Sequence, residues 1–380
     1  MALIYLDHSA TTWPSDKTIA DYARDLHQFA GNPASLHRLG QQAARLVQDS
    51  KASLARSLGG QSCEVILTSG GSESINLAIK GTVAANPKRG RTIVTLAGEH
   101  AATRETLSYL HRQGYTIRTV GIQANGQVDL AQLETAIDET TVMITLLLVN
   151  NETGAVQPLD EIVAIRNRKR PRAAIHVDGV QACGKIPVHF DQMGIELFSG
   201  SGHKFGSPKG IGFLLVKKGL SIQPLIHGGG QQSGLRGGTE NAPLAASMAR
   251  SLKHSVATLD SRLHLCQSLR SLLLSELQSL GVSFVQISPE AAVPHILNLA
   301  FPGLRGETMQ HALEEADIYV STGSACSSHK KGPSEVLRSM GIPVSTTECS
   351  IRISLSDSNT EEDVVHTARS IAQACLKYRR

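Results

Sequence analysis

The stretch Ser199-Gly200-Ser201-Gly202-His203-Lys204-Phe205-Gly206 places a single lysine among small and polar residues. Upstream of it, the hydrophobic run Ala174-Ile175-His176-Val177-Asp178 ends on an aspartate, which is costly there unless it is exposed or paired. A further apolar run, 211–216, begins soon after Lys204. We therefore expect Asp178 at the end of a buried strand and Lys204 at a turn close to the core.

Working outward from this stretch, short apolar runs alternate with amphipathic segments over the first two thirds of the chain. The apolar runs predict buried strands at 65–67, 92–96, 142–149, 173–177, 195–198 and 211–216. Amphipathic periodicity predicts helices over 41–58, 75–80, 103–112, 130–137 and 159–166. Strands separated by helices indicate an α/β fold, with a mostly parallel central sheet covered by helices on both faces. Ligands of such sheets bind at the carboxyl ends of the strands.

The pattern changes near Asn241. A long helical stretch over 244–280 leads to strand-like runs, and a final helix extends through Lys377. The strand-like runs are 282–287, 295–301 and 351–355. We predict a large domain over 14–257 and a smaller α+β domain made of 1–13 and 258–380.

Composition excludes several classes of protein. The chain has 380 residues, 41% hydrophobic and 18% charged, with a net charge of +4, as in ordinary globular proteins. Its cysteines are scattered without a CxxC pair, which argues against a zinc cage or a disulfide framework and fits a reducing compartment. We expect no signal peptide, no membrane span, no metal site and a cytoplasmic location. The basic run 166–172 has two interpretations, a solvated helix end or a docking patch for an acidic partner.

Lys204 and Asp178 are the two groups that a pyridoxal-phosphate enzyme needs. The lysine can form a Schiff base with the cofactor, and the aspartate can keep the pyridine nitrogen protonated. The run Thr68-Ser69-Gly70-Gly71-Ser72-Glu73-Ser74 follows a predicted strand and precedes a helix, so its N–H groups can hold a phosphate. Singly, each feature has an ordinary explanation, as a surface lysine, a strand-end turn or a helix cap. Together they favour pyridoxal 5'-phosphate.

At this point the chain closely resembles cysteine desulfurases, within the class V aminotransferase-like, fold-type I pyridoxal-phosphate enzymes. The resemblance runs almost from end to end and rests on long patterns. They are Tyr5-Leu6-Asp7-His8-Ser9-Ala10-Thr11-Thr12, 31–37, 68–80, Glu99-His100, Asn150-Asn151-Glu152-Thr153-Gly154, 176–181, 201–212, Arg236-Gly237-Gly238-Thr239-Glu240-Asn241, 321–327 and 351–354.

The resemblance implies roles for single residues around the cofactor. Lys204 would be the Schiff-base lysine and Asp178 the partner of the ring nitrogen. His100 would stack on the ring and help to transfer protons. Gln181 and Asn151 would lie on the side of the ring's phenolic oxygen, and Asn151 would also touch the substrate.

The resemblance likewise implies how phosphate and substrate are bound. The phosphate would be held by Gly71, through its N–H, and by Ser72, Ser201 and His203. Thr239 matches a residue that reaches the phosphate of the neighbouring subunit, which implies a homodimer with shared sites. Arg352 would bind the substrate α-carboxylate, for which its planar fork is well shaped.

Cys326 decides the reaction that we expect. It lies in the small, polar run 321–333, typical of a mobile surface loop, and its surroundings match the persulfide-forming loop of the desulfurases. Its thiolate would attack the sulfur of L-cysteine, leaving alanine and an enzyme persulfide for a sulfur-acceptor protein in iron–sulfur cluster assembly or tRNA thiolation. Two alternatives stay open: a selenocysteine or cystine lyase, and a non-catalytic scaffold for sulfur transfer. Whether Cys326 also ligates a transient iron–sulfur cluster is open too.

Overall fold

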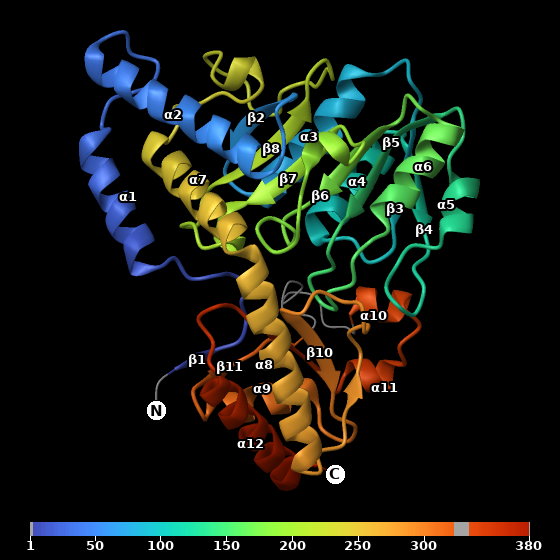
Figure 1. The fold of residues 1–380 in the computed structure, drawn as a ribbon. Coiled ribbons are helices and arrows are strands. Elements are labelled where there is room, and N and C mark those ends of the chain that lie inside the picture. The colour runs from blue at the N-terminus through green and yellow to red at the C-terminus, as the bar shows by residue number, and fades with distance from the viewer. Residues whose placement is uncertain (1–2, 323–333, 380) are drawn as a thin grey trace.

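A computed structural model describes residues 3–322 and 334–379. A central sheet of seven strands fills the upper lobe in Figure 1, in the order β2-β8-β7-β6-β5-β3-β4. Strand β8 runs antiparallel to both of its neighbours, while the pairs from β7 across to β4 are parallel. The strands are β2 (Cys63–Thr68), β3 (Thr92–Leu96), β4 (Thr116–Val120), β5 (Thr141–Leu147), β6 (Ala174–Asp178), β7 (Leu197–Ser201) and β8 (Gly212–Lys217).

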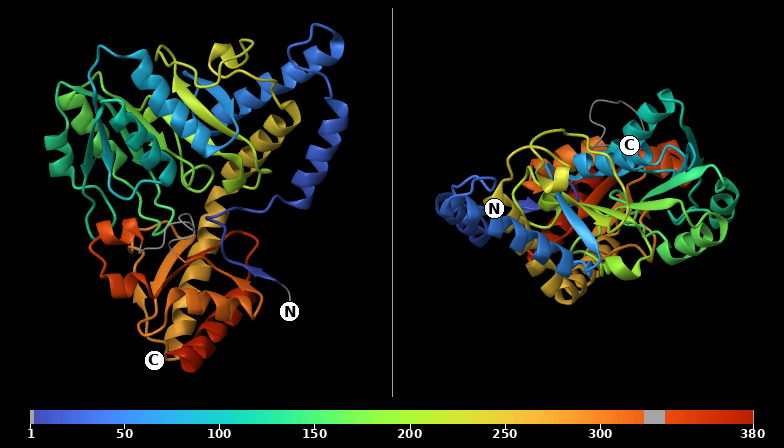
Figure 2. Two further views of the ribbon diagram at one scale, coloured as in Figure 1. Left: turned by 180° about the vertical axis from the view of Figure 1, so that it is seen from behind. Right: turned by 90° about the horizontal axis from the view of Figure 1, so that it is seen from above.

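Helices cover both faces of this sheet, as Figure 2 shows in the view from behind and from above. One face packs in a hydrophobic core against α3 (Gly71–Ala85) and α4 (Ala101–Arg112). The other face packs against α2 (Arg38–Ser57), α5 (Leu130–Ala136), α6 (Leu159–Lys169) and α7 (Ala242–Ala257). This arrangement confirms the α/β fold with a mostly parallel sheet. Central strands such as β5 are buried at every residue because helices exclude water from both sides.

The lower lobe has its own core, to which the N-terminal segment contributes Ile4 and Leu6. Strand β1 (Ile4–Tyr5) pairs in parallel with β11 (Ile318–Tyr319). An antiparallel sheet has the order β12-β10-β9. The remaining elements here are β9 (Val285–Gln286), β10 (Ile296–Ala300), β12 (Ser350–Ser354), α8 (Leu259–Ser279), α9 (Gly306–Glu314), α10 (Glu335–Ser339), α11 (Val344–Thr347) and α12 (Glu361–Tyr378).

The long helix expected over 244–280 is two helices, α7 and α8, joined at Thr258. The Thr258 hydroxyl donates to the carbonyl of His254, and Arg262 turns back to donate to the carbonyls of Ser255 and Gly184. Arg262 thus ties the break both to the end of α7, at Ser255, and to the turns after β6, at Gly184. The two helices connect the lobes (Figure 1). Ile296, which belongs to the predicted small domain, packs in the core of the upper lobe. The predicted domain boundary at 257 therefore stays a prediction.

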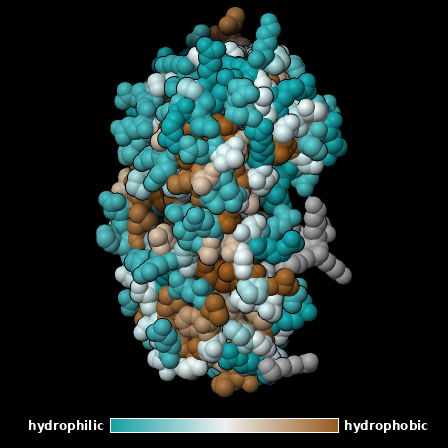
Figure 3. All heavy atoms as spheres, turned by 90° about the vertical axis from the view of Figure 1, so that its right-hand side faces the viewer, coloured by the Kyte–Doolittle hydropathy of each residue, from teal (hydrophilic) through white to brown (hydrophobic). Residues whose placement is uncertain are grey.

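Three short 3₁₀ turns and one further helix complete the described chain: η1 (Phe190–Gln192), η2 (Gly202–Lys204), η3 (Gln232–Gly234) and α1 (Asp16–Gln28). No helix in the described part of the chain is long and apolar enough to span a membrane. Figure 3 shows the side that carries α5 and α6 above and α10 and α11 below. Hydrophilic side chains dominate its upper part, and apolar ones gather toward the lower lobe.

The basic run 166–172 is not uniformly solvated. Arg166 is buried, and its guanidinium donates to Glu196 at 2.9 Å and to the carbonyls of Ala173 and Gly194. It therefore ties the end of α6 to the strand that follows. Arg170 and Arg172 remain at the surface beside Arg89.

Candidate active site

Five strands of the central sheet end at one cavity of about 190 Å³. Because the carboxyl ends of parallel strands meet at one edge of a sheet, residues far apart in the sequence come together there. The cavity is lined by Ser9, Gly71, Ser72, Ile75, His100, Leu147, Asn151, Asp178, Val180, Gln181, Ser201, His203 and Lys204. Nine of the residues expected around the cofactor thus share one cavity: Gly71, Ser72, His100, Asn151, Asp178, Gln181, Ser201, His203 and Lys204.

Lys204 ends the 3₁₀ turn after β7, and the N-terminal segment folds over it. Its Nζ donates to the carbonyl oxygens of Ser9 at 2.6 Å and Ala10 at 2.8 Å. Thr12 closes the contact, since its N–H donates to His203 O and its hydroxyl to Lys204 O. The motif at 5–12 was noted in the sequence without a role, and its contribution is to hold the lysine loop.

Asp178 ends β6 and is 2% exposed. One carboxylate oxygen accepts the N–H of Val180 at 3.0 Å. Burial raises the pKa of Asp178 to about 6, against the opposing effects of this hydrogen bond and of Lys204. A carboxylate in this setting is stabilised by a cation placed in the cavity, such as a protonated pyridine.

An anion cradle lies at another part of the wall, where α3 begins. Gly71 and Ser72 open this helix, whose first N–H groups have no helical acceptor. A Cβ on Gly71 would lie 2.8 Å from Val180 Cγ2 and 3.4 Å from Ser201 Cβ. The wall therefore has no room for a side chain there, and a ligand can approach the backbone. His203 is nearby, with its Nδ1 3.2 Å from the Thr11 hydroxyl.

His100 is the N-cap of α4, at the end of the loop after β3. Its Nδ1 accepts the N–H of Ala102 at 3.1 Å, so the proton of the neutral ring is on Nε2. Burial, with Lys204 and Arg104, lowers the pKa of His100 to about 4. The ring is therefore neutral near pH 7.

Arg352 reaches the site from β12 of the lower lobe. It is 2% exposed, and it donates to the carbonyl of Asn151 at 2.9 Å and to Asp7 Oδ1 at 2.5 Å. Its Nε has no hydrogen-bond partner among the described residues. Asp7 was missed as the ion-pair partner of Arg352, because the two are distant in sequence and meet only through the bridge from Asp7 to Ser354.

Gln181 has a partner that the sequence did not suggest. Its Nε2 donates to Ser9 O, and its Oε1 accepts from Lys185 Nζ, each at 2.9 Å. Lys185 thereby fixes which end of the amide faces the cavity. The two are four residues apart in the turns after β6, a spacing that could have suggested the pair.

Two expected residues lie elsewhere. Thr239 is exposed, in the loop between η3 and α7, and it does not line this cavity. Its role at the neighbouring subunit stays a prediction. Cys326 lies outside the described residues.

The sequence matches known proteins along almost its whole length. The family profile "Aminotransferase class-V" matches residues 4–366. "Cysteine desulfurase IscS" of Dictyoglomus turgidum is 34% identical over 379 residues, covering 99% of this chain and 95% of that protein. The protein of the same name from Methanosarcina thermophila is 34% identical, covering 99% and 93%.

Solved structures agree. A "NIFS-like protein" superposes with a TM-score of 0.93 at 36% identity, covering 99% of this chain and all of that one. "SspA in complex with cysteine" has a TM-score of 0.81 at 29% identity, covering 93% and 98%.

The cavity suits the cofactor of this family. It combines an amine, a buried carboxylate and an anion cradle, and Ser9 Oγ on its wall has no partner among the described residues. These groups match the aldehyde, ring nitrogen and phosphate of pyridoxal phosphate. The chain belongs to the class-V aminotransferase family, among its pyridoxal-phosphate-dependent cysteine desulfurases.

Proposed function

We propose that the protein removes sulfur from L-cysteine, giving L-alanine and a persulfide on Cys326. One observation carries the proposal. Lys204, Asp178 and the first turn of α3 line a single cavity, in a chain that matches cysteine desulfurases over its full length. The pattern around Cys326 supports the persulfide from the sequence alone, since that residue lies outside the described part of the chain.

Each wall of the cavity would hold one part of pyridoxal phosphate. Lys204 would bind it covalently, and Asp178 would pair with the ring nitrogen. His100 would stack on the ring, while Gln181 and Asn151 would face its phenolic oxygen. The phosphate would be held by Gly71, Ser72, Ser201 and His203, with Thr239 of a second copy completing the site.

When bound, the cofactor supplies an electron sink that acidifies the substrate Cα–H and weakens the C–S bond. The Lys204 amine, once the substrate amine has displaced it, would take the Cα proton. His100 would assist this proton transfer by donating a hydrogen bond from Nε2, where its neutral ring carries the proton. Asp178 would stay ionised through pairing with the ring nitrogen, despite the burial that raises its pKa in the chain alone.

Arg352 would orient the substrate by its α-carboxylate. Its guanidinium already has two of its edges held, by Asp7 and by the carbonyl of Asn151. The Arg352 side chain is thus already ordered before the substrate arrives. Binding the substrate therefore costs less side-chain entropy, which favours tight binding. Asn151 would touch the same substrate from the loop after β5.

Cys326 would complete the sulfur transfer. Its thiolate would form an S–S bond to the substrate sulfur as the C–S bond breaks, and the electron pair of that bond would pass to the carbon, which is protonated to give alanine. The persulfide would then pass to an acceptor protein for iron–sulfur cluster assembly or tRNA thiolation. The proposal includes a homodimer and a cytoplasmic location. The described cysteines, all free thiols, are consistent with that location.

The decisive experiment mixes purified holoenzyme with L-cysteine and dithiothreitol and measures alanine and sulfide together. We expect one-to-one formation of the two products, and a persulfide adduct on Cys326 when an alkylating agent replaces the reductant. Neither product should form with Lys204→Ala. Alanine without sulfide, or a persulfide on another cysteine, would overturn the proposal.

Cys326→Ala separates the proposal from a selenocysteine or cystine lyase, which works without this thiol. We expect this variant to keep the visible absorbance of the bound cofactor and to lose cysteine desulfuration. Unchanged desulfuration in Cys326→Ala would favour the lyase. A protein without any cofactor absorbance would favour the non-catalytic scaffold.

A further inference from the structure

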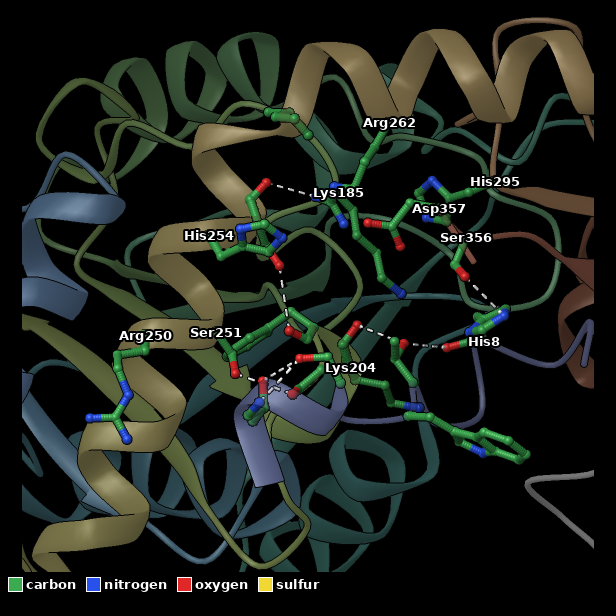
Figure 4. Close-up of a pocket in the computed structure, with 18 of the residues that line it drawn as sticks. His8, Lys185, Lys204, Arg250, Ser251, His254, Arg262, His295, Ser356 and Asp357 are labelled. Carbon is green, nitrogen blue, oxygen red and sulfur yellow. Dashed lines mark hydrogen bonds between the residues drawn. The ribbon is translucent and has the colours of Figure 1, made fainter. Parts of the chain in front are cut away.

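A second, larger cavity of about 290 Å³ lies behind the lysine loop, where the two lobes meet. Among the described residues it shares only Lys204 with the cofactor cavity. Figure 4 shows its polar walls, to which both lobes contribute. They include His8 from the N-terminal segment, Lys185 from the turns after β6, Arg262 from α8, and His295.

Lys185 is the most unusual member of this wall. It is 8% exposed, and its Nζ makes a hydrogen bond to Gln181 Oε1. An ammonium group carries three N–H donors and costs several kcal/mol to bury without a counter-charge. In Figure 4 its side chain extends along the cavity, with Arg262, His295 and Asp357 gathered on one side of it.

The charges that act on Lys185 are mainly positive. Burial, then Lys204, Arg262 and Arg352, lower the pKa of Lys185 to about 7, and the weaker, opposite effect comes from Cys183. The largest charge effects on Lys185 thus come from cations and not from carboxylates. Arg262 and Arg352 remain cations whatever Lys204 binds, and Asp7 pairs with Arg352.

His295 is a second unusual residue of this wall. It is 6% exposed, lines the cavity, and its Nε2 has no hydrogen-bond partner among the described residues. Its pKa is well below the usual value, because of burial and then of Lys185 and Arg262. A neutral imidazole can present an N–H to a ligand. His295 thus has one ring nitrogen without a hydrogen-bond partner, beside a cationic wall.

Two carboxylates, Asp21 and Asp357, also line the cavity, and neither makes a salt bridge to Lys185 in the described part of the chain. Asp21 is ion-paired with Lys17 and Arg24 on α1. Asp357 is exposed, and its charge raises the pKa of Arg262 and of His8 without reversing the effect of burial on either. Leu259, Leu263 and Leu355 complete the wall with apolar surface.

We propose that this cavity binds a small oxyanion, a phosphate or a short carboxylate, between Lys185 and His295. The anion would accept from the Lys185 ammonium and from an imidazole N–H of His295, with Arg262 adding a long-range attraction. The apolar wall leaves room for a short aliphatic chain. Since Lys185 also binds Gln181, an anion held here would contact the cofactor site through one intervening side chain.

The test is calorimetric titration of holoenzyme, without L-cysteine, with inorganic phosphate and separately with butyrate. Sodium chloride at equal ionic strength serves as the blank. We expect saturable binding of at least one of the two anions, at one site per chain. Lys185→Met should weaken it about tenfold or more, the loss expected for one charge-assisted hydrogen bond, while Lys185→Arg should retain it.

His295→Phe provides a second comparison, because the ring shape is kept and the donor is lost. It should also weaken binding several-fold, and it decides the matter should Lys185→Met fail to fold. Arg172→Gln removes one charge from the separate basic surface beside α6 and should leave binding unchanged. If phosphate binds and butyrate does not, the site is assigned to phosphate-like ligands. If butyrate binds and phosphate does not, it is assigned to carboxylates.

Three outcomes would overturn the proposal: no saturable binding of either anion above the chloride blank, equal affinity in Lys185→Met and His295→Phe to that of wild type, or loss of binding in Arg172→Gln alone. Anomalous scattering from holoenzyme crystals soaked in bromide shows where the anion binds. A peak between Lys185 and His295 is expected, and peaks confined to the molecular surface would count against the site. Because no substrate is turned over, a negative result leaves the desulfurase proposal untouched.

Discussion

At the level of single residues, Asp178 gives the clearest energetic consequence. Its folded-state pKa of about 6 lies above its ordinary value of 3.8, so folding favours the protonated form. The stability of the apoenzyme is therefore unaffected below pH 4 and falls as the pH rises toward 6, by roughly 3 kcal/mol for this group. Asp178→Asn removes that penalty. We expect the apo variant to be more stable than wild type at pH 7.5 and about equally stable at pH 4.

Urea denaturation of cofactor-free protein at the two pH values checks this. Asp191→Asn is a matched control of opposite sign, because hydrogen bonds from Ser62 and Gln61 lower the pKa of the exposed Asp191. That variant should lose stability at pH 7.5. Added pyridoxal phosphate should stabilise wild type much more than Asp178→Asn, and equal stabilisation would contradict the assigned pairing with the ring nitrogen.

A substitution at Arg352 should weaken substrate binding and leave cofactor binding unchanged. In Arg352→Lys one positive charge is kept, but the planar fork that binds a carboxylate is lost. We expect kcat/KM for L-cysteine to fall about 100-fold, mostly through a higher KM, while pyridoxal phosphate binds as before. Arg338→Lys, on the exposed side of α10, is the control and should change neither value. Loss of cofactor binding in Arg352→Lys would show that its role at the substrate is wrong.

Sequence patterns located the strand-end residues of the site, and they did so for a physical reason. Asp178 and Lys204 each follow an apolar run, so their strand-end positions can be read from local order. Asp7 could not be found in this way. Its pairing with Arg352 depends on how the N-terminal segment packs against β12, and local patterns carry no information about that packing.

At the level of elements, the start of α3 makes its own prediction. Gly71→Ala would place a Cβ 2.8 Å from Val180 Cγ2, so Val180 or the helix end must shift. Because the N–H groups of this turn are placed to hold phosphate, we expect the affinity for pyridoxal phosphate to fall about tenfold. Absorbance titration of the apoenzyme measures it. Val180→Ala alone should have little effect, and Gly71→Ala/Val180→Ala should recover part of the loss.

No recovery in the double variant would mean that the glycine is needed for another reason, such as backbone conformation at Gly70.

The elements themselves were largely predictable, since a buried parallel strand such as β5 is a continuous apolar run. The break at Thr258 was not, because α7 and α8 continue one helical pattern and the bond from Arg262 to Gly184 at the break is tertiary. The buried position of Arg166 was hidden in the same way, inside an apparently solvated basic run.

At the level of the whole molecule, catalysis depends on both lobes. The cofactor cavity belongs to the upper sheet, yet Arg352 comes from the lower lobe and Lys204 is covered by the N-terminal segment. Asp7 joins these parts, since it pairs with Arg352 and lies two residues before Ser9. Asp7→Asn should therefore loosen the lobes as well as the substrate site. We expect it to lower the unfolding midpoint, and to raise the KM for cysteine.

The last prediction concerns a pair of chains. Thr239 is exposed and lies outside its own cavity, which suits a residue that serves the neighbouring subunit. In a mixed dimer of Lys204→Ala with Thr239→Val, the site that keeps Lys204 would receive a normal Thr239 and should bind the cofactor normally. In a dimer of wild type with a chain carrying both changes, the site with Lys204 would face the introduced valine and should bind several-fold more weakly. Differently tagged, co-purified dimers titrated with pyridoxal phosphate separate the cases. Equal affinity in the two dimers would show that Thr239 acts within its own chain or not at all.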